Sequence, residues 1–152
     1  MDYIAVANHL IEQKYTYKSG ICFLGGSAGG LTGTAVANMA PELFFSMLLL
    51  VPFCDPLTTM LNEKLPLTPS EWKLWGNPIK SKKYFESILS YSPYNNLRRT
   101  SYPPMLVTTS LFDSRVLYSE PIKYVAKLRE LKSDKNLQLL KCKMKAASHG
   151  GP

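Results

Sequence analysis

The segment Gly25-Gly26-Ser27-Ala28-Gly29-Gly30 constrains the fold of this chain more than any other feature. It contains the pattern Gly-x-Ser-x-Gly directly after an apolar run at 21–24, and a run that favours a helix follows at 31–39. A serine on such a strand-to-helix turn is typical of a nucleophile elbow, where its backbone is strained. We expect flanking glycines because a Cβ there would collide with neighbouring chain. The helix N-terminus would offer the backbone N–H of Ala28 to an oxyanion. A glycine-rich turn with an uninvolved serine is the alternative.

Composition predicts one globular domain. The chain has 152 residues, 45% of them hydrophobic and 19% charged, which is enough for a real core. No apolar run approaches the roughly 20 residues of a membrane helix. The first residues have no basic region before an apolar stretch, so no secretory signal is expected. Cys22, Cys54 and Cys142 fit neither a metal site nor a disulfide framework, so buried reduced thiols are expected. These features predict a cytoplasmic protein with no metal, no cofactor and no membrane contact.

The net charge of +7 comes from lysines scattered through the C-terminal half. Such an excess is compatible with nucleic-acid binding, but no basic stripe interleaved with aromatic residues and no binding motif accompanies it. A lysine-rich solvated surface is therefore the favoured interpretation, and no nucleic acid is predicted as a partner.

The hydrophobic pattern alternates between strands and helices. Strands are predicted at 21–24, 46–51, 105–109 and 137–142, and helices at 3–14, 31–39 and 119–131. Residues 53–104 are rich in Pro, Trp and Tyr and lack strand alternation, so we expect a helical excursion over the sheet. Alternation of this kind predicts an α/β fold with a mostly parallel sheet and flanking helices.

Three candidate catalytic residues follow predicted strands. Ser27 comes after the first strand, Asp113 after the third and His149 after the fourth. In parallel sheets, reactive groups gather beyond the carboxyl ends of the strands. The order Ser, Asp, His is that of α/β-hydrolases. In this interpretation Ser27 attacks a carbonyl, His149 accepts the proton, and Asp113 orients the imidazole.

Each of these residues also has a structural explanation. Aspartate is common in turns, so Asp113 alone would be an ordinary loop residue. The glycine after His149 is typical of a tight loop, which has a structural use as well. Three purely structural residues would have to fall by coincidence in the order Ser, Asp, His. This is much less expected than a structural role for any one of them, so the catalytic interpretation is favoured.

Motifs along nearly the whole chain resemble the prolyl oligopeptidase family of serine peptidases, and within it the oligopeptidase B group. The matching segments are Gly-Gly-Ser-Ala-Gly-Gly at 25–30, Ala-Asn-Met-Ala-Pro-Glu-Leu-Phe at 37–44, Val-Pro-Phe at 51–53, Leu-Thr-Thr-Met-Leu at 57–61, Leu-Pro-Leu-Thr at 65–68, Glu-Trp at 71–72, Trp-Gly-Asn-Pro at 75–78, Tyr-Ser-Pro-Tyr at 91–94, Leu-Val-Thr-Thr at 106–109, Val-Ala-Lys-Leu-Arg at 125–129 and His-Gly-Gly at 149–151. The resemblance implies the same three catalytic residues and cleavage of peptides after Arg or Lys.

The resemblance also implies a pocket for the basic side chain, formed by two carboxylates one residue apart. The first falls on Glu71, but the second falls on Lys73, whose charge would repel the substrate. Thr68-Pro69-Ser70-Glu71 is also a capping-box pattern, so a helix-capping role for Glu71 stays open. Ser148 stands where the family usually has glycine.

By the resemblance, residues 1–152 are the C-terminal portion of a partial α/β-hydrolase peptidase domain, without the β-propeller and early strands of the family. The upstream tyrosine that donates to the oxyanion has no counterpart here. The expected function is that of a serine peptidase acting on peptide substrates, with doubtful activity alone and with the missing N-terminal part as a partner. Alternatives are a non-catalytic remnant, a subunit of a split enzyme, or an esterase-type acyl hydrolase.

Overall fold

The structure is a computed structural model, and it describes residues 2–145 and 149. Four strands alternate with helices along the chain. The elements in order are α1 (Asp2–Glu12), β1 (Ile21–Gly26), α2 (Ser27–Met39), the 3-10 turn η1 (Pro41–Leu43), β2 (Phe44–Leu50), α3 (Pro56–Met60), α4 (Thr68–Trp75), α5 (Lys82–Tyr91), β3 (Met105–Ser110), α6 (Ser119–Leu131) and β4 (Gln138–Lys143).

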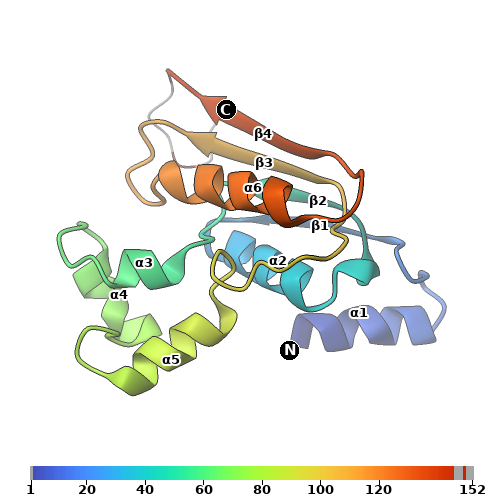
Figure 1. Cartoon of the computed structure of the whole chain (residues 1–152). Coiled ribbons are helices and arrows are strands. Elements are labelled where there is room, and N and C mark those ends of the chain that lie inside the picture. Colours follow the sequence, from blue (N-terminus) through green and yellow to red (C-terminus); the bar gives the residue numbers. More distant parts are fainter. Residues whose placement is uncertain (1, 146–148, 150–152) are drawn as a thin grey trace.

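The strands form one parallel sheet in the order β1-β2-β3-β4. Each crossover between neighbouring strands carries at least one helix, and the longest crossover contains α3, α4 and α5. In Figure 1 these three helices lie beside the sheet as a separate group, while α6 lies against the strands. The predicted α/β fold with a parallel sheet and a helical excursion at 53–104 is confirmed.

One face of the sheet forms the main core. Phe23, Met47, Leu49 and Val107 are buried there against helices α2 and α6. Helix α2 contributes small residues at this contact, and a Cβ added to Gly33 would lie 2.3 Å from Phe23 Cε1. The absence of that Cβ lets the helix backbone approach the sheet closely. The close approach fixes the N-terminus of α2 relative to the end of β1.

A second apolar cluster packs the helical excursion. Its buried members are Leu31, Phe53, Leu57, Met60, Ile88 and Val116, with Trp72 and Trp75 partly buried against them. These residues come from α2, the segment after β2, the helices α3, α4 and α5, and the loop after β3, so the cluster joins the excursion to the carboxyl edge of the sheet. This second core positions the walls of the pocket described below.

The opposite face of the sheet carries a row of leucines in register. Leu24 pairs with Leu48, Leu48 with Leu106, and Leu106 with Leu139. Leu24 is 67% exposed and Leu139 is 48% exposed, although both lie on strands. Cys22 is also exposed and Cys142 is half-buried, so only Cys54 meets the expectation of buried thiols. We call Leu24, Leu48, Leu106 and Leu139 the leucine row.

The predicted elements differ from the observed ones mainly at their ends. Strand β1 continues through Gly25 and Gly26, and helix α2 begins at Ser27 rather than at residue 31. Glycine pairs through its backbone like any residue, so the two glycines extend the ladder despite their low strand propensity. Helix 119–131 is as predicted. None of the described helices has the length and apolar character needed to cross a membrane.

Candidate active site

Ser27 occupies the turn between β1 and α2, with a backbone φ of 52°. A positive φ is unfavourable for a residue with a side chain. Gly25 permits the turn, because a Cβ there would lie 2.6 Å from Phe23 Cε1 and 2.8 Å from the Gly29 carbonyl oxygen. A Cβ on Gly29 would meet nothing within 4 Å, so the expected collision at that glycine is wrong. The strained serine of an elbow is thus present, with crowding at Gly25 and none at Gly29.

The first turn of α2 supplies the electrostatics of the elbow. The Phe53 N–H donates to the Ser27 carbonyl oxygen at 3.0 Å, which ties the turn to the segment after β2. The first N–H groups of a helix have no partner within the helix, so that of Ala28 is available beside the serine. Ala28 also lines the pocket next to Ser27. Its role as an oxyanion donor remains a prediction.

Asp113 and His149 form a hydrogen-bonded pair. The His149 Nδ1 atom lies 2.8 Å from Asp113 Oδ2 and 3.0 Å from Oδ1. The Asp113 side chain is fully buried in this contact. Its Oδ1 atom also accepts the backbone N–H groups of Arg115 and Val116, at 2.8 and 3.0 Å. The carboxylate is therefore fixed by its own loop, and it can hold the imidazole with Nε2 directed away from Asp113.

Ser27 and the Asp113 loop lie at the same edge of the sheet, because both follow the carboxyl ends of parallel strands. Ser27 lines the same pocket as Ser114, Arg115 and Val116. Although Ser27 and His149 are both described, the structure records no hydrogen bond between them. The structure thus joins Asp113 and His149 directly, and it places Ser27 at a pocket that is lined by the residues following Asp113. Ser148 lies outside the described residues.

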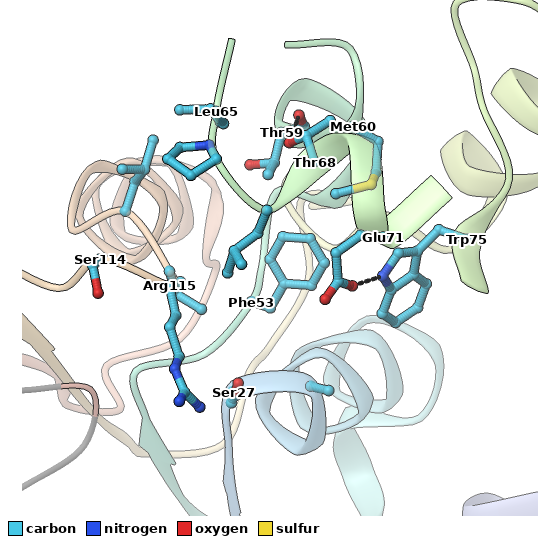
Figure 2. A pocket seen from close by; sticks show the side chains of 15 residues that line it. Ser27, Phe53, Thr59, Met60, Leu65, Thr68, Glu71, Trp75, Ser114 and Arg115 are labelled. Atoms are coloured by element: carbon cyan, nitrogen blue, oxygen red, sulfur yellow. Dashed lines mark hydrogen bonds between the residues drawn. The ribbon is translucent and has the colours of Figure 1, made fainter. Parts of the chain in front are cut away.

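The pocket has a volume of about 360 Å³. That size is typical of small-ligand sites, which are apolar clefts with a few polar groups. One wall comes from residues 59–68, a second from 114–117, and α4 supplies the end with Glu71 and Trp75. Figure 2 shows Phe53 in the middle, between Glu71 and the Arg115 side. The Phe53 and Trp75 rings have centroids 5.8 Å apart and form an aromatic surface.

Glu71 faces this pocket from helix α4. Its Oε2 atom accepts the indole N–H of Trp75 at 2.5 Å. The capping-box interpretation is wrong, because Thr68 is the first residue of the helix rather than its cap. The Thr68 hydroxyl instead donates to the Thr59 carbonyl oxygen at 3.0 Å. Glu71 is therefore a carboxylate held by an indole at the pocket, where it can receive a cation.

Lys73 is exposed and does not line the pocket. It follows Glu71 by two positions on a helix, and residues so spaced do not share a face. The expected direct repulsion of a cationic substrate by Lys73 therefore has no basis in this geometry.

Arg115 is a pocket residue that the sequence analysis missed. In Figure 2 its side chain extends toward Ser27 from the loop after β3. A signal was present, since Arg115 lies two residues after the predicted catalytic aspartate. Its backbone N–H donates to that carboxylate, which fixes the loop from which the Arg115 side chain enters the pocket. Arg115 can therefore bind an acceptor group of a ligand close to Ser27.

A buried charged cluster lies behind the pocket wall. Lys123 Nζ contacts Asp55 Oδ2 at 2.6 Å, and the Asp55 side chain has no exposed surface. Burial, opposed by hydrogen bonds from Thr59 and the Asp55 backbone, raises the pKa of Glu120 from 4.5 to about 7. No described group of three or more His, Cys, Asp or Glu side chains is arranged to hold a metal ion.

A parallel sheet with helices packed on it and a strained serine at its carboxyl edge defines the α/β-hydrolase class of fold. Comparison with known families narrows this class. The family model described as "Prolyl oligopeptidase family" matches residues 1–152. The chain belongs to the prolyl oligopeptidase family.

Relatives and solved structures agree with this assignment. Dipeptidyl aminopeptidase BI of Pseudoxanthomonas mexicana is 49% identical over 150 residues, which cover 99% of this chain and 20% of that protein. Protease 2 of Moraxella lacunata is 50% identical over 149 residues, covering 98% and 21%. The structure of oligopeptidase B from Leishmania major matches with a TM-score of 0.92 and 48% identity, over 95% of this chain and 20% of that one. The chain thus spans about a fifth of the length of these relatives.

Proposed function

We propose that this chain carries the acyl-transfer site of a serine peptidase, with Ser27 as nucleophile, His149 as general base and Asp113 as the group that orients His149. The observation that carries the proposal is the 2.8 Å contact between His149 Nδ1 and Asp113 Oδ2, at the edge of the sheet where Ser27 lies. Membership of the prolyl oligopeptidase family supports the same assignment. A related structure, oligopeptidase B from Trypanosoma brucei, holds covalently bound antipain.

The proposed reaction follows from these positions. Ser27 Oγ attacks the carbonyl carbon of a peptide bond while His149 Nε2 accepts the hydroxyl proton. The carbonyl oxygen becomes an oxyanion, and the N–H of Ala28 donates to it. His149 then gives the proton to the departing amine, which leaves an acyl ester on Ser27. Water attacks this ester by the same route and releases the acid. Asp113 keeps its charge and stabilises the imidazolium throughout.

Glu71 supports a preference for basic residues at the cleaved bond. Its carboxylate lies at the pocket end opposite Arg115, beside the Phe53 and Trp75 rings. These rings would cover the apolar stem of a lysine or arginine, and the carboxylate would receive the charged head. The Arg115 guanidinium would bind a carbonyl oxygen of the substrate near Ser27.

A fluorophosphonate probe tests the nucleophile without requiring turnover. The full chain is expected to be labelled on one serine, and Ser27→Ala should abolish the labelling. Ser114→Ala, at the same pocket, is the matched control and should keep it. Labelling that survives in Ser27→Ala would refute the assignment. A folded chain that is not labelled would favour the alternative of a non-catalytic remnant.

Substrate panels test the specificity. Peptides with Arg or Lys before the cleaved bond should react faster than neutral peptides, and Glu71→Gln should remove this preference while p-nitrophenyl ester hydrolysis changes little. If esters are cleaved and no peptide is, the chain is an esterase-type acyl hydrolase. If Glu71→Gln slows esters and basic peptides equally, Glu71 does not select the basic side chain.

We also propose that residues 1–152 act as the C-terminal portion of a peptidase domain and work with further hydrolase strands and helices as partner. Two structural features support this. Strand β1 pairs on one side only, with β2, among the described strands. In the leucine row, Leu24, Leu106 and Leu139 are 67%, 38% and 48% exposed, and a leucine left fully exposed would forfeit about 1.5–3 kcal/mol of burial. Exposed sheet edges promote association with other chains.

Sedimentation of the full chain tests this second proposal. Self-association is expected, and the double substitution Leu106→Lys and Leu139→Lys should reduce it. Adding a polypeptide with the remaining segments of the family's hydrolase domain should form a complex and raise labelling of Ser27. A monomeric chain that unfolds cooperatively and has full peptidase turnover alone would refute the proposal.

A further inference from the structure

The two walls of the pocket come from distant segments and are joined by one buried side chain. Glu120 is the second residue of α6, directly after the 114–117 wall. Its Oε1 atom accepts the Thr59 hydroxyl at 2.5 Å, and Thr59 belongs to the opposite wall. Its Oε2 atom accepts the backbone N–H of Asp55 at 2.9 Å, at the N-terminus of α3. One carboxylate therefore holds both ends of the short helix α3 against α6.

The contacts of α3 continue to the helix that carries Glu71. The Thr59 carbonyl oxygen accepts the Thr68 hydroxyl at 3.0 Å, and the Met60 carbonyl oxygen accepts the Trp72 indole N–H at 3.0 Å. Both donors belong to α4. A displacement of α3 relative to α6 would therefore move α4, and Glu71 with it, relative to Ser27.

The cluster around Glu120 contains two carboxylates and one cation. Asp55 is paired with Lys123, whose ammonium group also lies 4.9 Å from the Tyr94 ring centroid. Cys54 is fully buried, and this burial raises its thiol pKa well above the usual value, so it stays neutral. Glu120 thus carries the charge that is not compensated within the cluster. Because burial raises its pKa to about 7, it exchanges a proton near neutral pH.

Protonation conflicts with the hydrogen bonds of Glu120, because both of its oxygens face donors. The Asp55 N–H is part of the backbone and cannot turn. A proton on Oε1 would instead require the Thr59 hydroxyl to rotate and accept, and that hydroxyl proton would then need another acceptor. Uptake of one proton would therefore weaken the link between the two walls at Thr59.

We propose that Glu120 is a positioning residue for the pocket, and that its negative charge holds the Thr59 wall and the Glu71 helix in register with Ser27. The proposal rests on the proposed function in that this pocket is taken as the substrate site. It predicts that the pocket is ordered when Glu120 is ionised and loosens when it is neutral. The substitution Glu120→Gln imitates the neutral state without changing the size of the side chain.

Nuclear magnetic resonance of the full chain tests the linkage without activity. The chain has two tryptophans, so two indole N–H signals report on Trp72 and Trp75, assigned with Trp72→Phe and Trp75→Phe. Between pH 5 and 9 both signals should shift in the parent chain. In Glu120→Gln this shift should vanish, with the signals fixed at their low-pH positions. The control Glu130→Gln, an exposed position on the same helix, should titrate like the parent.

Histidine side chains also change charge in this range, but both histidines remain in Glu120→Gln. A titration that persists unchanged in Glu120→Gln would therefore overturn the proposal. Thr59→Val tests the same contact from the other side and should likewise fix the signals. It replaces the first variant if Glu120→Gln does not fold, as judged by circular dichroism. Titration of Thr59→Val identical to the parent would also overturn it.

Fluorophosphonate labelling separates this inference from the proposed function. In Glu120→Gln at pH 8, we expect the probe concentration for half-saturation to rise about tenfold, because misplaced walls cost orientation. The limiting rate should change little, because Ser27, Asp113 and His149 are untouched. Absence of labelling in the parent with the indole titration intact would refute the proposed function alone. Parent-like saturation in Glu120→Gln would refute the positioning role.

Discussion

Gly29 and Gly30 are neighbours in helix α2, yet replacing each with alanine should have opposite effects on stability. A Cβ on Gly30 would lie 2.5 Å from both the Cα and the Cβ of Pro52. A Cβ on Gly29 would meet nothing within 4 Å. Pro52 cannot yield easily, because the Val51 N–H before it donates to the Thr108 carbonyl oxygen at 2.9 Å. Helix α2 and the segment after β2 therefore approach each other closely at Gly30 and Pro52.

The magnitudes follow from this contact. Alanine is favoured over glycine by about 1 kcal/mol within a helix. Overpacking costs about 1–3 kcal/mol, and the upper end applies to Gly30 because backbone atoms cannot change rotamer. We expect Gly30→Ala to lower the free energy of unfolding by about 2 kcal/mol. Gly29→Ala should raise it by about 0.5 kcal/mol, because first-turn positions gain less.

Urea and thermal unfolding followed by circular dichroism measure both effects at one protein concentration, so that association is equal. For a chain of this size, 1 kcal/mol shifts the melting temperature by about 2–4 °C. Gly30→Ala should therefore melt clearly below the parent, and Gly29→Ala slightly above it. Equal melting of the two variants would show that α2 does not approach Pro52 as closely as described.

Three further outcomes are expected. Burial of the carboxylate raises the pKa of Glu120 from 4.5 to about 7, so the folded chain binds more protons in that interval, and the free energy of unfolding should fall by about 3 kcal/mol as pH rises from 4.5 to 7. This cost is the desolvation of the charge. The bonds from Thr59 and the Asp55 backbone oppose it and favour the ionised form, so ionisation orders the pocket while it lowers the overall stability. Urea titrations should show a flatter profile for Glu120→Gln, and an unchanged profile would contradict the shift. Lys73→Glu should change the kcat/KM ratio of basic to neutral peptides by no more than about fivefold, since Lys73 is exposed; a hundredfold change would place Lys73 in the pocket. The Tyr124 hydroxyl is buried without a partner among the described residues, so Tyr124→Phe should leave the free energy of unfolding in urea unchanged or raise it. Tyr102→Phe should lower that free energy by about 1 kcal/mol, because it loses the hydrogen bonds of its hydroxyl. A larger loss of stability for Tyr124→Phe than for Tyr102→Phe would refute this.

The hydrophobic pattern of the sequence was sufficient to predict the fold class and the location of most helices and strands. Buried parallel strands are continuous apolar runs, and helix α6 has a clear apolar stripe, so both are visible in the sequence. Strand β1 was predicted two residues short because its last residues are glycines. The helices within 53–104 could be expected only as a group, since their limits depend on tertiary contacts such as the Thr68 hydroxyl bond to Thr59.

The candidate site could be predicted only in part. Ser27, Asp113 and His149 were predicted as one group because sheet topology places strand ends together, and that rule needs no side-chain detail. Their catalytic roles remain predictions. Lys73 was expected at the pocket because the resemblance places a pocket carboxylate of the family at that position, but here Lys73 is exposed and does not line the pocket. Glu120 gave no signal, because an isolated glutamate at a helix start is usually an exposed partner of the helix dipole.

The carboxyl edge of the sheet and the face with the leucine row differ in how far contacts within the chain satisfy their side chains. On the pocket side, Asp113 and Glu120 are buried and each has partners within the chain. Buried charges without partners would be strongly destabilising, so the geometry of the pocket is determined by contacts that this chain makes with itself. On the face with the leucine row, Leu24 and Leu139 require no specific partner, because burial against any apolar surface removes them from water. Substitutions on the leucine row should therefore alter association and stability with little effect on the pocket, whereas a single change at Glu120 alters the pocket directly.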